Sequence, residues 1–225
     1  MLTNYLRFLR APAYVYQNQP VRWGELAVLL VGYFAVVFAL GLVIQALADY
    51  LLLEHALEDP STTIVLLGAL VIPPIEEVMF RLWLRVSRSA LFGVAFLVLF
   101  VGVLLLPVSQ RGAMLLIALS VLILVATLMG YDDDIERVMA RYFGIFFYGS
   151  AILFALVRIT NYTPLNAQTL LFSPVLVLPQ FIMGTVLGYV RVRYGIGYSI
   201  LLHVVNNTIL FTAMFVVMQY FPDLA

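Results

Sequence analysis

The run GELAVLLVGYFAVVFALGLVIQA at residues 24–46 decides the class of fold, because it is almost wholly apolar and long enough for a helix to cross a membrane. A transmembrane helix needs about 20 such residues. The whole chain has 225 residues, of which 64% are hydrophobic and 11% are charged, and one soluble core cannot hide that much apolar surface. The runs lack the alternating pattern of a membrane β-barrel. We therefore expect an all-α integral membrane protein.

Six further apolar runs follow the first, so the predicted fold is a polytopic bundle of about seven transmembrane helices, within a range of six to eight. The predicted spans are 24–46, 62–84, 90–106, 113–129, 142–158, 170–190 and 196–219. Prolines between residues 160 and 180 make that region the place where a re-entrant segment could replace a crossing. No soluble domain remains, so residues 1–225 are expected to form a single transmembrane domain.

Arginine residues indicate the orientation of the spans, since cytoplasmic loops carry an excess of positive charge. With a cytoplasmic N-terminus, the outer loops hold only Arg111. The inner loops then hold Arg7, Arg10, Arg22, Arg81, Arg85, Arg88, Arg137, Arg141, Arg191 and Arg193. We therefore expect the N-terminus in the cytoplasm. Leucine and aromatic residues at helical spacing beside Arg7 and Arg10 predict a short interfacial helix before the first span.

Composition also excludes several classes of function. The chain has no lysine and no long basic run, so nucleic acid is not an expected partner. It has no cysteine, which excludes disulfides, thiolate metal sites and a cysteine nucleophile. Any catalysis must therefore use oxygen or imidazole groups.

The sequence EEVMFR at residues 76–81 places two carboxylates and a cation inside a predicted span, where such groups mark functional sites by default. Two prolines precede it, so we expect a fresh helix to begin at Pro74 with both glutamates in its first turn. Glu77 and Arg81 are four residues apart and can pair, whereas Glu76 points about 100° away. An ordinary helix end with snorkelling side chains is the alternative, but Glu77 lies about 12 Å below the interface.

Two later positions also put polar groups inside predicted spans. His203 and Asn207 are four residues apart on one helix face, at a depth of about 15 Å from Arg193, which is similar to the depth of the glutamates. Arg158 follows an apolar run that is short for a full crossing, so it is expected either to seek a carboxylate partner in the membrane or to snorkel to the outer surface.

Three patterns together resemble the CPBP family of intramembrane proteases, which includes the eukaryotic CAAX prenyl endopeptidases and the bacterial Abi proteins. They are Glu76-Glu77-x-x-x-Arg81, Phe154-x-x-x-Arg158 and His203-x-x-x-Asn207. Residues 179–191 look like the glycine-containing helix before the last motif of the family. The resemblance covers roughly residues 70–207, the expected protease core.

The resemblance implies an intramembrane endopeptidase whose site opens to the cytoplasm. Glu76 or Glu77 would activate water for attack on a peptide bond, and Arg81 would tune the glutamate pair. His203 and Asn207 would stabilise the oxyanion or orient groups. The implied partners are membrane lipids and a peptide or protein substrate, prenylated or not, and the implied location is a bacterial inner membrane.

Arg158 departs from the family pattern, which has histidine at that position. Arginine cannot accept a proton near neutral pH and has no lone pair for a metal, so activity is expected to be weak or absent. The family leaves open a divalent metal such as Zn; its ligands here would be Glu77 and His203, and Arg158 disfavours it. Three readings stay open: an endopeptidase, a catalytically inactive relative that binds a membrane peptide or protein partner, and, ranked last, a transporter.

Overall fold

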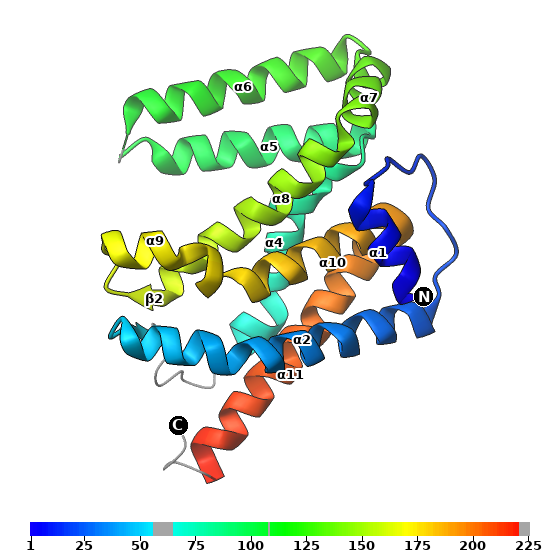
Figure 1. The fold of residues 1–225 in the computed structure, drawn as a ribbon. Helices are drawn as coiled ribbons and strands as arrows, with labels where there is room; N and C mark the ends of the chain where they lie inside the picture. Colours follow the sequence, from blue (N-terminus) through cyan, green and yellow to red (C-terminus); the bar gives the residue numbers. More distant parts are fainter. Residues whose placement is uncertain (56–64, 108, 221–225) are drawn as a thin grey trace.

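The computed structural model describes residues 1–55, 65–107 and 109–220, and this part of the chain is a bundle of α-helices (Figure 1). The helices are α1 (Leu2–Arg10), α2 (Trp23–Tyr50), α4 (Ile72–Arg81), α5 (Arg88–Leu105), α6 (Gln110–Leu128), α7 (Asp132–Arg141), α8 (Phe143–Val157), α9 (Ala167–Leu176), α10 (Leu178–Tyr194) and α11 (Ile196–Tyr220). The described strands β1 (Glu54–His55) and β2 (Tyr162–Thr163) form one short antiparallel pair. The predicted all-α polytopic class is confirmed.

Five described helices are long and apolar enough to cross a membrane, and a bent pair supplies a sixth candidate. The five are Trp23–Tyr50, Arg88–Leu105, Gln110–Leu128, Phe143–Asn161 and Ile196–Val217. Helices α9 and α10 meet at a 45° bend and count as one broken span or a re-entrant loop, next to the prolines that predicted an irregular segment. The predicted span 62–84 begins outside the described residues, and its described part is not one continuous α-helix.

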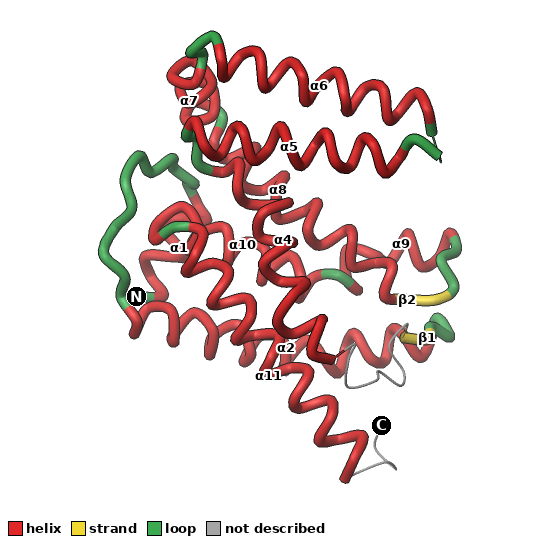
Figure 2. Tube along the Cα trace, turned by 180° about the vertical axis from the view of Figure 1, so that it is seen from behind, coloured by secondary structure: helices red, strands yellow, loops and turns green. Residues whose placement is uncertain are grey.

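Helix α4 begins after an interruption of the regular α-helix, which the two prolines help to explain. A π-helical turn at Leu67–Val71 precedes it, and both prolines occupy its first turn, where their missing N–H groups are tolerated. The helix starts at Ile72, two residues before the predicted Pro74, so its first turn contains no acid and the glutamates fall in the second turn. Helix α4 crosses the middle of the bundle in Figure 2, where it packs against α8 and α11.

Helix α10 is the most continuously buried element, and its glycines permit close packing. A Cβ atom built on Gly184 would lie 3.1 Å from Ala151 Cα, and one on Gly188 would lie 2.8 Å from the ring of Phe147. Small residues allow helix backbones to approach in this way within membranes. Gly184 and Gly188 therefore allow α10 to pack closely against α8.

Helix α1 is present as predicted, but one side of it docks against the bundle. Tyr5 is buried, shares a 2.6 Å hydrogen bond with Thr185 and packs edge-on against Tyr189. Burial raises the pKa of the Tyr5 hydroxyl to about 12. Leu2 and Leu6 remain exposed on the other side, where an interfacial helix would meet lipid.

Helices α5 and α6 run side by side at the top of Figure 1, and Ser120 ties them by donating a 2.7 Å hydrogen bond to the carbonyl of Ala95. The ends of the helices that carry arginine lie together on the right of the same view, where α2, α5 and α8 begin and α10 ends. This clustering agrees with the orientation that the arginine pattern predicts.

Gly184→Ala tests the contact between α8 and α10. The new methyl group would press on the backbone of Ala151, so we expect the free energy of unfolding to fall by about 1–3 kcal/mol. The measurement is thermal unfolding in detergent micelles. The matched control is Gly149→Ala in α8, where the added Cβ meets no atom within 4 Å and helix propensity favours alanine. Equal shifts in the two variants would contradict the proposed close approach.

Candidate active site

The predicted pair of Glu77 and Arg81 forms the buried base of the site. Both side chains are 0% exposed, and Arg81 Nη1 lies 2.5 Å from Glu77 Oε1. The guanidinium carbon of Arg81 also sits 4.2 Å from the ring centroid of Phe154 on α8, a cation–π contact. Arg81 Nε and Nη2 have no hydrogen-bond partner among the described residues, so the carboxylate and the aromatic ring are what stabilise this cation.

Glu77 has two more partners, both on α11. His203 Nδ1 lies 2.9 Å from Glu77 Oε1, and Ser199 donates a hydrogen bond to Glu77 Oε2. The sequence prediction did not include Ser199. Its spacing from His203 was the available signal, because residues at i and i+4 share a helix face. With these contacts, both carboxylate oxygens of Glu77 are occupied.

Glu76 faces a different partner, as its helical position predicted. Arg158 Nη2 lies 2.6 Å from Glu76 Oε1 and 2.5 Å from Oε2. The Glu76–Arg158 pair is less buried than the Glu77–Arg81 pair, since 12% of the Glu76 side chain and 24% of the Arg158 side chain remain exposed. The prediction that Arg158 contacts one of the two glutamates is confirmed, and its alternative, snorkelling to the outer surface, is wrong.

His203 lies between the two glutamates. Its Nδ1 contacts Glu77, and its Nε2 lies 3.6 Å from Glu76 Oε2, which is beyond a direct hydrogen bond. The ring packs edge-on against Phe154, with centroids 5.6 Å apart. The structure therefore brings together all three sequence motifs around one imidazole.

Asn207 belongs to the same region, but its hydrogen bonds go elsewhere. Its Nδ2 donates to the carbonyl of Gly68 at 3.0 Å, and its Oδ1 accepts from Asn206 Nδ2 at 3.1 Å. Gly68 lies in the π-helical turn that precedes α4. Asn207 thus ties α11 to this turn, rather than binding a glutamate.

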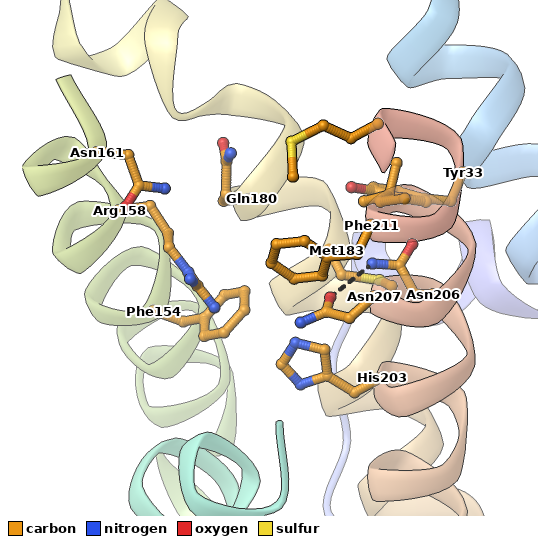
Figure 3. Close-up of a pocket in the computed structure, with 12 residues that line it drawn as sticks. Tyr33, Phe154, Arg158, Asn161, Gln180, Met183, His203, Asn206, Asn207 and Phe211 are labelled. Carbon is orange, nitrogen blue, oxygen red and sulfur yellow. Dashed lines mark hydrogen bonds between the residues drawn. The ribbon is translucent and has the colours of Figure 1, made fainter. Parts of the chain in front are cut away.

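A cavity of about 190 Å³ opens beside these groups (Figure 3). Its lining residues are Tyr33, Phe154, Arg158, Asn161, Gln180, Met183, His203, Asn206, Asn207, Leu210, Phe211 and Met214. Asn161 follows α8 and Gln180 begins α10, so the cavity extends away from the arginine-rich ends of these helices. The cytoplasmic opening that the resemblance implies stays a prediction. A separate cavity of about 630 Å³, lined among others by Arg85 and Arg191, lies on the arginine-rich side.

The residues present do not fit a divalent metal. No group of three or more histidine or acidic side chains among the described residues is arranged to hold one. The ring nitrogens of His203 face different glutamates, so they do not converge with both carboxylates on one point. Each carboxylate also has an arginine in contact, and that positive charge would repel a metal cation.

Glu77→Gln tests the buried ion pair. Breaking such a pair leaves an uncompensated charge on Arg81, so we expect the free energy of unfolding to fall by about 3–5 kcal/mol, and Glu77→Gln with Arg81→Met to recover part of the loss. Thermal unfolding in detergent micelles measures both. Asp134→Asn is the control, because its exposed pair with Arg137 should contribute at most about 1 kcal/mol. Similar losses in Glu77→Gln and Asp134→Asn would show that Glu77 is not a structural centre.

Comparison with known proteins agrees with this geometry. A protein-family model described as type II CAAX prenyl endopeptidase Rce1-like matches residues 59–209, which contain all three motifs. Neither the curated proteins nor the solved structures gave a match. The family match spans more than half of the chain, and the apolar helices agree with a membrane location. The chain therefore belongs to the Rce1-like family of CAAX-type intramembrane proteases.

Proposed function

We propose that this chain is a latent member of its protease family, which binds a membrane-associated peptide in the cavity while Arg158 suppresses hydrolysis. One observation carries the proposal: Arg158 Nη2 contacts both carboxylate oxygens of Glu76. Family membership supports a peptide or protein substrate. The proposed substrate class is a peptide with a C-terminal Cys-aliphatic-aliphatic-X sequence, prenylated on its cysteine. The proposed location is a bacterial inner membrane.

Glu76 is the better candidate for the general base of the family reaction. Both oxygens of Glu77 already accept hydrogen bonds, and its side chain is fully buried. Glu76 retains some exposure and lies against Arg158 and His203, two residues that line the cavity. A base must reach the water that it deprotonates, and only Glu76 meets this geometric requirement.

Peptide hydrolysis at this position would need three events. Glu76 would take a proton from water, the resulting hydroxide would attack the peptide carbonyl, and the proton would pass to the leaving amine as the C–N bond breaks. Donors at the cavity would stabilise the oxyanion that forms on the carbonyl oxygen. The imidazole of His203 is close enough to Glu76 to orient it through a short movement or a bridging water.

Arg158 opposes the first of these events. Its guanidinium is always charged and touches both oxygens of Glu76, so a water molecule must displace it before Glu76 can act as a base. Charge-assisted contacts of this kind are roughly twice as strong as neutral hydrogen bonds. The ion pair therefore competes directly with water activation.

An active endopeptidase is the second candidate, and a separate observation favours it. Arg158 and Asn207 both line the cavity, and each carries N–H donors. In this reading, substrate binding separates Arg158 from Glu76, and the guanidinium then donates to the oxyanion. The two candidates differ in what replacement of Arg158 does to turnover.

Arg158→His is the decisive variant. Releasing Glu76 should increase cleavage of a farnesylated fluorogenic peptide ending in Cys-Val-Ile-Met by about 100-fold, the scale of general-base catalysis. Glu76→Gln in the same background should abolish the gain. Cleavage is measured with purified protein in lipid vesicles, and binding to the unaltered chain by fluorescence anisotropy.

Arg111→His is the matched control, since it makes the same chemical change at an exposed position outside the cavity. If the unaltered chain cleaves as fast as Arg158→His and loses turnover in Glu76→Gln, the active endopeptidase is correct. Absence of both cleavage and binding in every variant would reject a peptide site of either kind.

A further inference from the structure

Asn206 presents a buried side-chain oxygen that has no hydrogen-bond partner in the described part of the chain. It precedes Asn207 on α11, lines the cavity and is only 3% exposed (Figure 3). Its Nδ2 donates to Asn207 Oδ1, whereas its Oδ1 has no hydrogen bond among the described residues. Neither the motifs nor the sequence prediction includes Asn206.

The orientation of this amide follows from a relay of hydrogen bonds that starts at the backbone. The carbonyl of Gly68 can only accept, so the group of Asn207 that faces it must be the NH₂. The oxygen of Asn207 is then left to face Asn206, which must present its own NH₂ in turn. Asn206 Oδ1 is therefore the free end of the relay, and rotating the amide would break the bond to Asn207.

An acceptor left in this state is unusual. Most buried polar atoms in folded proteins have at least one partner, and an unsatisfied one costs about 1–3 kcal/mol. Gln180, on α10, lines the same cavity and also has a buried Oε1 without a partner in the described part of the chain. Two unsatisfied oxygens at one cavity indicate a ligand that supplies hydrogen-bond donors.

We propose that Asn206 Oδ1 accepts a backbone N–H of the bound peptide and so positions the chain against Glu76. This inference rests on the proposed peptide-binding function and names a residue that sets its register. A peptide offers one N–H per residue except at proline, so proline is excluded at the position that Asn206 contacts. Gln180 Oε1 is a second acceptor for the same chain.

The other residues that line the cavity determine which peptide side chain fits beside the hydrogen-bonded N–H. Met183, Leu210, Phe211 and Met214 give the cavity an apolar side, which suits an aliphatic side chain. Pockets for whole drug-sized ligands have volumes of about 300–1,000 Å³, and this cavity has about 190 Å³. It therefore takes a short part of a peptide, and an attached isoprenoid stays in the surrounding lipid.

A backbone N-methyl scan tests the contact. The probe is the farnesylated Cys-Val-Ile-Met peptide, carrying one N-methyl group at a time, and affinity is measured by anisotropy in lipid vesicles. We expect methylation at one position to weaken binding to the unaltered chain about three- to tenfold, the value of one neutral hydrogen bond. In Asn206→Leu the same methylation should change affinity less than twofold.

The control variant is Asn206→Gln, which keeps both the amide N–H donor and the oxygen acceptor and should keep the sensitivity to methylation. Thermal unfolding checks that each variant folds, and Asn206→Ala, which also lacks an acceptor, replaces Asn206→Leu if the latter does not. A purely structural role would lower affinity equally for all peptides, without coupling to one position.

The outcomes distinguish a failure of this inference from a failure of the proposed function on which it rests. If the peptide binds, but every methylation has the same effect in Asn206→Leu as in the unaltered chain, the inference is wrong and peptide binding stands. If the peptide binds neither the unaltered chain nor Arg158→His, the proposed function fails and the inference fails with it.

Discussion

The cost of burying charge in an apolar bundle is the constraint on which the rest of this structure depends. Glu77 and Arg81 are fully enclosed, so each needs the other, and both need support from neighbouring helices. Phe154 on α8 covers the cation, Ser199 and His203 on α11 bind the carboxylate, and Arg191 on α10 donates to the carbonyl of Arg81. Four helices thus meet at one ion pair. The broken start of α4 matters for the same reason, because it sets which glutamate faces which helix.

The two adjacent carboxylates, Glu76 and Glu77, differ in their contacts and in their proposed roles. Glu77 contacts side chains that join α4 to α11, whereas Glu76 contacts Arg158 and lies 3.6 Å from His203. In the proposed function, the buried Glu77–Arg81 pair keeps the geometry of the site when Arg158 separates from Glu76. The arginine at position 158 therefore bears on chemistry more than on assembly. The same helix, α11, carries the relay from Gly68 through Asn207 to Asn206, so the groups proposed to hold a peptide share a scaffold with the groups proposed to cleave it.

Helical periodicity accounts for the parts of the site that the sequence predicted. Glu77 with Arg81 lies within one helix, and the opposite direction of Glu76 follows from its neighbouring position. The shared depth of the motifs predicted that His203 would lie near a glutamate, and the short apolar run before Arg158 predicted a carboxylate partner for it. Ser199 and Asn206 were missed because a serine or asparagine in a helix commonly bonds locally or packs, and nothing in its type indicates a partner on another helix. The start of α4 was placed two residues late, since proline is tolerated within the first turn and does not mark its first residue.

The sequence by itself determined the class of fold, the approximate spans and the family, because these depend on apolar length and motif spacing. The orientation that follows from arginine placement stays a prediction. The tertiary structure decided which carboxylate is sealed, that both oxygens of Glu76 meet Arg158, and that the cavity extends away from the arginine-rich ends. It also decided that Asn206 ends a relay with a free acceptor. Each of these depends on contacts between helices that are far apart in the chain, and helix periodicity constrains only neighbours along one helix.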